Sequence, residues 1–107
     1  MEAYQVLEKA LGLIENEENW VSHSSGGPRY YCAIGALRAA WDGPESIVWI
    51  PGYRSLKAAC PMSIPDFNDS HSHAEVCDLF KRAVADAKSD AGIYLEVPAK
   101  EGVEANV

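Results

Sequence analysis

Five polar side chains of this sequence are of the types that cysteine-dependent catalysis uses. Cys32 lies at the start of a stretch typical of a helix, and the positive end of a helix dipole favours the thiolate, the nucleophilic form of cysteine. Further along, His71 or His73 could act as the base, and Asn68 or Asp69 could orient whichever imidazole faces the thiol. Such an arrangement would support acyl transfer or hydrolysis.

The same residues also have a structural interpretation, which we favour. Cysteine is among the residue types most often buried, and Cys32 precedes an alanine-rich segment typical of a packed helix. Short polar side chains such as Asn68 and Asp69 bond to nearby backbone amides and shape turns. They could equally cap the N-terminus of the Cys32 helix, and the spacing leaves both roles open.

A metal site is a weaker interpretation of the histidine-containing stretch. His71 and His73 are two positions apart, and the available further ligands are Asp69 and His23. None of these has the regular spacing that marks a zinc site. We therefore expect no metal and no cofactor.

The net charge of -7 over 107 residues disfavours some classes of partner. Proteins that follow phosphates cluster their lysines and arginines, whereas the basic residues here are scattered. No apolar stretch approaches the roughly 20 residues that span a bilayer, and the glutamate-rich start lacks the features of a signal peptide. Three cysteines without a C-x-x-C pair fit reduced thiols. We expect one globular domain over residues 1–107, in the cytoplasm, with no nucleic-acid or membrane partner.

Three segments have the apolar periodicity of helices. The first starts at residue 3 and should end near residues 16–19, and the second covers about residues 32–41. The third begins at the capping-box pair Ser72 and Glu75 and continues to about residue 88. Because the second segment is rich in alanine and glycine, other helices can approach it closely, and we expect it at the centre of the fold.

The remaining segments are predicted to be short. Residues 47–50 resemble a short strand or a buried strip, and residues 54–60 could form one or two helical turns. Residues 61–65 favour extended chain, because proline disfavours helix at the preceding residue. Residues 93–97 alternate like a strand that could pair with residues 47–50. Residues 99–107 should fray. The predicted fold class is mainly α (α+β), with three principal helices around the small-residue helix and room for a short two-stranded β element.

Two aromatic residues of the middle segment are candidates for a binding surface. Trp49 and Tyr53 flank the turn-forming pair Pro51 and Gly52. Aromatic side chains dominate binding hot spots. We expect any that stay exposed here to anchor a protein partner.

Two short motifs resemble those of a known family. They are Cys-Ala-Ile-Gly-Ala at residues 32–36 and Phe-Asn-Asp at residues 67–69, separated and flanked by helices. The chain resembles, over about residues 3–88, a domain-of-unknown-function family of small proteins from actinobacteria and their phages. Phe67 stands where that family commonly has tryptophan. The resemblance marks as motif positions, without a role, Cys32, Gly35, Ala36, Asn68 and Asp69.

The leading functional hypothesis is a non-enzymatic protein-binding module. It follows from the incomplete catalytic signature, the acidic composition and the exposed-aromatic candidates Trp49 and Tyr53. The family resemblance implies a chain that is phage-encoded and acts on a host protein. The alternative is a small cysteine-dependent hydrolase or acyl transferase, with Cys32 as nucleophile, His73 or His71 as base, and Asp69 or Asn68 as orienter. The oligomeric state is left open.

Overall fold

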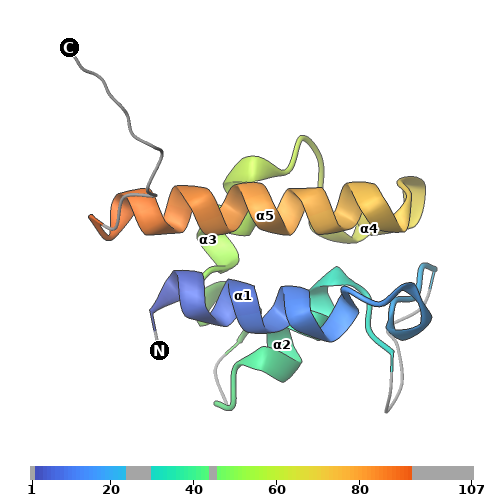
Figure 1. The fold of residues 1–107 in the computed structure, drawn as a ribbon, viewed down its shortest axis with the longest axis horizontal. Coiled ribbons are helices and arrows are strands. Elements are labelled where there is room, and N and C mark those ends of the chain that lie inside the picture. The colour runs from blue at the N-terminus through green and yellow to red at the C-terminus, as the bar shows by residue number, and fades with distance from the viewer. Residues whose placement is uncertain (1, 24–29, 44–45, 93–107) are drawn as a thin grey trace.

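The fold is mainly helical, as predicted. The structure, a computed structural model, describes residues 2–23, 30–43 and 46–92. Its elements are α1 (Ala3–Ile14), η1 (Glu17–Asn19), α2 (Ala33–Ala40), η2 (Ile47–Trp49), α3 (Tyr53–Ala59), α4 (Ile64–Ser70) and α5 (His73–Asp90), where η marks a 3-10 turn (Figure 1). Within these described ranges there is no β-strand, only an isolated parallel bridge between Trp20 and Tyr31.

The helix at the centre of the packing is α1, not the alanine-rich α2. Helix α1 packs against α5 on one side and α2 on the other, while α3 packs on α5 and α4 on α2. It can do so because its apolar residues cover more than one face, with Val6, Leu7, Ala10 and Ile14 fully buried. The small residues of α2 instead allow close approach to α1 from outside. The expected central position of α2 is therefore corrected.

Helix α2 has close to the predicted limits. Cys32 is its N-cap, in extended backbone, and Trp41 is its C-cap. Ala33, Ala36 and Ala40 are buried together with Leu37.

Two predictions for residues 45–65 are wrong. Residues 47–49 form the 3-10 turn η2 rather than a strand, and the partner strand predicted at residues 93–97 lies outside the described residues. Residues 64 and 65 begin α4 rather than continuing an extended chain. Proline is tolerated in the first helical turn, where its missing N–H would have had no intrahelical partner, and the Ser63 hydroxyl caps this turn by accepting from the Asp66 N–H at 3.2 Å.

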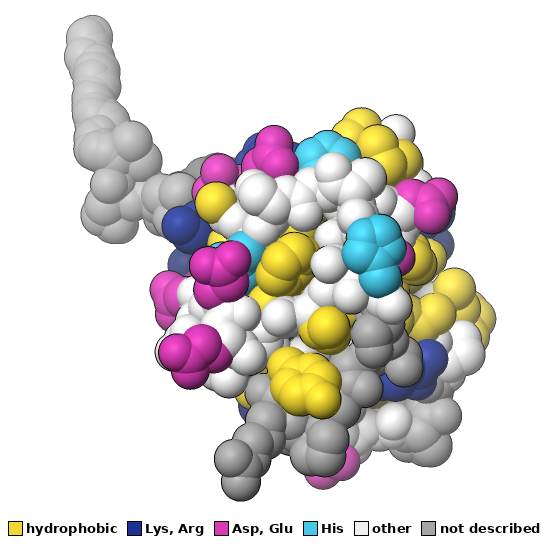
Figure 2. All heavy atoms as spheres, turned by 90° about the vertical axis from the view of Figure 1, so that its right-hand side faces the viewer, with side chains coloured by type: hydrophobic (Ala, Val, Ile, Leu, Met, Phe, Trp, Pro, Cys, Tyr) yellow, Lys and Arg dark blue, Asp and Glu magenta, His cyan; other side chains and the backbone are white. Residues whose placement is uncertain are grey.

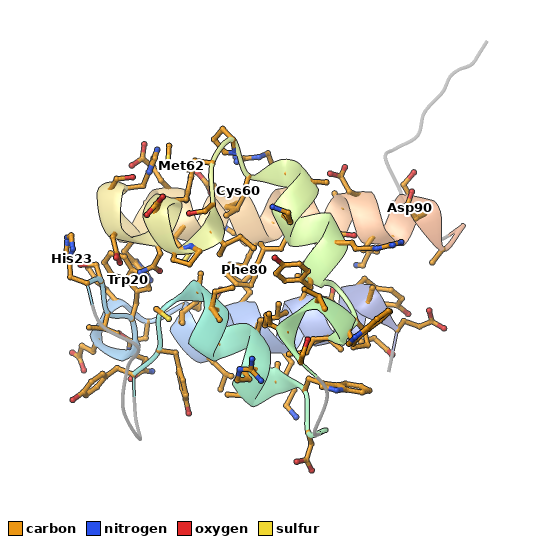
Figure 3. The ribbon with its side chains drawn as sticks, turned by 180° about the vertical axis from the view of Figure 1, so that it is seen from behind. Trp20, His23, Cys60, Met62, Phe80 and Asp90 are labelled. Carbon is orange, nitrogen blue, oxygen red and sulfur yellow. The ribbon has the colours of Figure 1, made fainter. Side chains whose placement is uncertain are left out.

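Helix α5 begins at the predicted capping box. The Ser72 hydroxyl accepts from the Glu75 N–H at 3.2 Å, and the Glu75 carboxylate accepts from the Ser72 N–H at 2.8 Å. Its buried stripe lies against α1 and α3. Phe80, which is fully buried, lies in the middle of the molecule in Figure 3. No helix in the described part of the chain is long and apolar enough to cross a membrane.

Gly52 fixes how closely α3 approaches α1. It is the N-cap of α3 and has a φ of 97°, a left-handed conformation that side chains rarely adopt. A Cβ at this position would lie 2.8 Å from Leu7 Cγ and 3.1 Å from the Ala3 carbonyl oxygen. The turn between η2 and α3 therefore requires glycine both for its backbone angle and for its contact with α1.

We predict opposite effects for two glycine-to-alanine substitutions. Gly52→Ala should lower the free energy of unfolding by about 2 kcal/mol or more, because it combines a strained φ with an overpacked contact at Leu7. Gly12→Ala is the control, since a Cβ at Gly12, inside α1, meets no atom within 4 Å. It should raise stability by roughly 0.5–1 kcal/mol. Urea unfolding of both variants tests this, and a stable Gly52→Ala protein would contradict the packing described.

Candidate functional site

The predicted site residue Asn68 is a buried hydrogen-bonding centre. Its side chain is 1% exposed. Its Oδ1 accepts from the Trp20 indole N–H at 2.8 Å and from the Ala33 backbone N–H at 3.0 Å. Its Nδ2 donates to the Val21 carbonyl oxygen at 3.0 Å and to Asp69 Oδ1 at 3.1 Å. A carboxamide offers two acceptor sites and two N–H donors, so all four are used.

These bonds join three segments that are distant in sequence. Asn68 belongs to α4, Ala33 is the first residue of α2, and residues 20–21 follow η1. The backbone around residue 20 is itself held, because the Tyr31 N–H donates to the Asn19 carbonyl oxygen at 2.8 Å and the Val21 N–H to the Tyr31 carbonyl oxygen at 3.1 Å. Asn68 thus caps the Cys32 helix, one of the two structural roles that the sequence left open.

Asp69 extends this cluster toward the surface. Its Oδ1 accepts from the His23 backbone N–H at 2.7 Å, and its Oδ2 lies 4.0 Å from Nδ1 of the His23 ring. The His23 N–H bond, followed by the Asn68 amide, holds the pKa of the Asp69 carboxyl below its usual value. His23 itself has a φ of 60°, uncommon outside glycine. Asp69 therefore fixes the chain where residue 23 turns.

His73 is bonded to the end of α1. Its Nε2 lies 2.6 Å from the Ile14 carbonyl oxygen. A carbonyl oxygen can only accept, so Nε2 carries the proton and donates it. The ring also lies against Trp20, with 5.6 Å between ring centroids. His73 thereby satisfies a carbonyl at the C-terminus of α1, which is otherwise without an intrahelical partner.

His71 is the C-cap of α4 and contacts a carbonyl oxygen of that same helix. Its ring stacks on Phe67 with centroids 3.8 Å apart and planes 9° apart. Its Nδ1 lies 3.1 Å from the Phe67 carbonyl oxygen and 2.9 Å from Ser70 Oγ. Histidine side chains gather on this end of the molecule (Figure 2).

Cys32 is half-buried, and its thiol lies at the start of α2. The Sγ accepts from the Gly35 N–H at 3.3 Å, which makes the thiol a helix cap. Asn68 lies close by, because its Oδ1 accepts from the backbone N–H of the next residue, Ala33.

Cys77, which was not predicted as a site residue, makes a thiol–imidazole contact with His73. Cys77 Sγ lies 3.4 Å from Nε2 of His73 and 4.0 Å from the Ile14 carbonyl oxygen. Burial raises the pKa of this thiol, which disfavours the nucleophilic thiolate form. The signal in the sequence was the four-residue spacing of His73 and Cys77, which places both on one helix face.

The hydrogen bonds of Asn68 and His73 show the structural role of these two side chains. The polar atoms of Asn68 bond to Trp20, Val21, Ala33 and Asp69, and Nε2 of His73 bonds to Ile14. Their observed role is to connect helix ends. The cysteine-dependent alternative stays a prediction. In the described ranges, no group of three or more His, Cys, Asp or Glu side chains could hold a metal ion.

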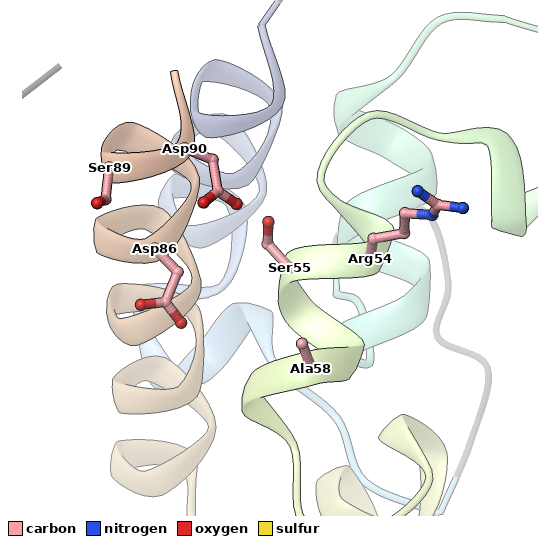
Figure 4. A pocket seen from close by; sticks show the side chains of 6 residues that line it. All are labelled: Arg54, Ser55, Ala58, Asp86, Ser89 and Asp90. Atoms are coloured by element: carbon pink, nitrogen blue, oxygen red, sulfur yellow. The ribbon is translucent and has the colours of Figure 1, made fainter. Parts of the chain in front are cut away.

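The predicted binding residues lie on a different part of the molecule. Trp49 is 74% exposed and Val48 is 49% exposed, whereas Tyr53 is half-buried against the core. They line an open hollow of about 740 Å³ formed by residues 48–55 with Ala3, Lys57 and Asp90, which we call the Trp49 hollow. A smaller hollow of about 380 Å³ adjoins it between α3 and α5, with Ser55, Asp86 and Asp90 on its walls (Figure 4).

We predict that Asn68→Ala strongly destabilises the protein. The substitution leaves the Trp20 indole N–H and the buried Ala33 N–H without an acceptor, which should cost about 3–4 kcal/mol in the free energy of unfolding. Asn16→Ala is the matched control, because exposed Asn16 makes a single cap bond to the Glu18 N–H at 3.0 Å. It should cost about 1 kcal/mol or less. Equal losses in denaturant unfolding would refute the central role of Asn68.

We also predict an acid-sensitive contribution from Asp69. Because the folded-state pKa of Asp69 is lowered, its contribution to stability is present above the unfolded-state pKa of roughly 3.9 and is lost as pH falls through the folded-state value. The stability difference between the wild-type protein and Asp69→Asn should therefore be largest near neutral pH. It should shrink as the pH falls below the pKa of free aspartate. Urea midpoints measured across this window test it. A difference that does not vary with pH would count against the Asp69–His23 bond.

Comparison with known proteins adds a family to this description. Residues 1–86 match DUF6197, a family of unknown function. No curated protein and no solved structure matched. The matched range contains Asn68 and every residue bonded to it, together with η2 and α3. The actinobacterial or phage origin and the family motifs around Cys32 and Asn68 stay predictions. Because the match spans most of its sequence, the chain belongs to this family of unknown function.

Proposed function

We propose that the protein is a binding module that recognises a segment of another protein at the Trp49 hollow. The observation that carries this proposal is the exposure of Trp49. An indole left 74% exposed beside a half-exposed Val48 keeps most of its apolar surface in water. Both side chains would release water from apolar surface when a partner covers them.

The backbone that presents Trp49 is already ordered. The Trp49 N–H donates to the Ser46 carbonyl oxygen at 2.9 Å, and the Ile50 N–H to the Ile47 carbonyl oxygen at 3.1 Å. Ile50, only 3% exposed, fixes this turn to the core. A pre-ordered anchor loses little conformational entropy on binding, which suits a recognition surface.

The charges of the Trp49 hollow indicate the chemistry of the partner. The protein carries a net charge of -7, yet this hollow has the exposed cations Arg54 and Lys57 against the single carboxylate of Asp90. Neither cation has an ion pair among the described residues. We infer that the partner segment combines a large apolar side chain, packed on Trp49, with a carboxylate that reaches Arg54 or Lys57.

The biological setting of this proposal comes from the family resemblance. It supplies a phage-encoded chain as the source and a host protein as the partner. We place the encounter in the cytoplasm, in keeping with three cysteines that are all free.

Selection from a displayed library of random peptides tests the proposal without knowledge of the natural partner. Enriched peptides should pair an aromatic or aliphatic residue with Asp or Glu. Trp49→Ala should weaken their binding by about 30-fold, a loss of roughly 2 kcal/mol that is typical of a hot-spot tryptophan. Charge reversal at Lys57 should weaken binding chiefly at low salt.

Met62→Ala is the matched control for this experiment. Met62 is 42% exposed, does not line the Trp49 hollow, and lies far from Asp90 along the molecule (Figure 3). Its removal should leave peptide binding unchanged. Peptides that bind Trp49→Ala as tightly as the wild-type protein, or the absence of any enriched peptide, would count against the proposed surface.

A further inference from the structure

The described part of the chain ends at the Trp49 hollow. Asp90 is the last residue of α5 and lines this hollow. The helix is closed there, because the Ala91 N–H donates to the Ala87 carbonyl oxygen at 3.1 Å and Gly92 has a φ of 78°. Residues 93–97 therefore follow within three to seven positions of a residue on the wall. At roughly 3.3–3.6 Å per residue this is a span of about 10–25 Å, so they can reach the hollow.

The sequence of this segment has the chemistry that the Trp49 hollow selects. Residues 93–97 read Ile-Tyr-Leu-Glu-Val, three large apolar side chains followed by a carboxylate and a valine. The full stretch of residues 93–107 carries three glutamates against one lysine. It is thus complementary in charge to Arg54 and Lys57, which have no ion pair among the described residues.

We propose that residues 93–97 occupy the Trp49 hollow of their own chain and compete there with the partner segment. This inference rests on the proposed function, because it assigns a regulator to the same surface. The contact is made by side chains, since residues 47–49 form a 3-10 turn and offer no strand edge. A short tether gives a local concentration on the order of millimolar, so even a weakly binding segment fills the hollow until a tighter partner displaces it.

The test uses the full-length protein and the indole N–H signals of its three tryptophans in NMR spectra. Trp49→Phe assigns the Trp49 signal by its disappearance. The double variant Tyr94→Ser/Leu95→Ser should move the Trp49 signal and leave those of Trp20 and Trp41 in place. The matched control Val103→Ser, outside residues 93–97, should move none of them. Unchanged Trp49 signals in the double variant would overturn the proposal.

A synthetic peptide of residues 93–107 identifies the occupant directly. Added to the double variant, it should return the Trp49 signal toward its wild-type position and weaken the binding of a library-selected peptide. A Trp49 signal that moves with protein concentration instead would identify a second copy of the chain as the occupant and would also overturn the proposal.

Affinity for a library-selected peptide separates this inference from the proposed function. The double variant should bind such a peptide about tenfold more tightly than the wild-type protein, because the internal competitor is gone. Equal affinity with an unmoved Trp49 signal would reject the internal competitor while leaving the binding function intact. A moved Trp49 signal without any selected peptide would support the internal contact and reject the binding function.

Discussion

The carboxamide of Asn68 is the interaction on which the rest of this structure depends. It lies where α4, the start of α2 and the segment after η1 meet, and its four hydrogen bonds use every polar site that it has. No strand pairing joins these segments among the described residues, apart from the single bridge at Trp20 and Tyr31. His73 does similar work at the end of α1. Buried polar networks of this kind specify one arrangement because each unmade bond is costly.

The two ends of the molecule are therefore used differently. Trp20 and His23 lie toward one end and Asp90 toward the other (Figure 3). At the first end, the side chains that the sequence marked as candidates for catalysis cap helices and hold turns. The Trp49 hollow, which includes Asp90, presents an exposed indole on an ordered backbone. A hydrogen-bonded frame at one end and an exposed indole near the other are consistent with the binding function proposed above.

Local signals predicted the helices well. Apolar periodicity and the Ser72–Glu75 capping box place α1, α2 and α5 because these signals operate within a few residues. The strand predicted for residues 47–50 is wrong, because a short apolar run has no period that separates a strand from the 3-10 turn observed there. Helix α4 was not predicted, because proline disfavours helix at the preceding residue. In the structure the Ser63 hydroxyl caps this helix all the same. The capping role of Asn68 was one of the predicted alternatives. Its bond to Trp20 and the His73–Ile14 contact were not predicted, because they join residues 48 and 59 positions apart, which no local pattern encodes.

Amide hydrogen exchange at Ala33 tests the central claim most directly. The first N–H of a helix has no intrahelical acceptor and normally exchanges quickly. Here Asn68 Oδ1 accepts it in a buried setting at 3.0 Å, so the account predicts that Ala33 exchanges only when the protein unfolds globally, with a protection factor close to that of the α5 core. The Trp20 indole N–H, bonded to the same oxygen, should be protected alongside it. Exchange of the Ala33 amide at the rate of an unstructured chain would contradict the account.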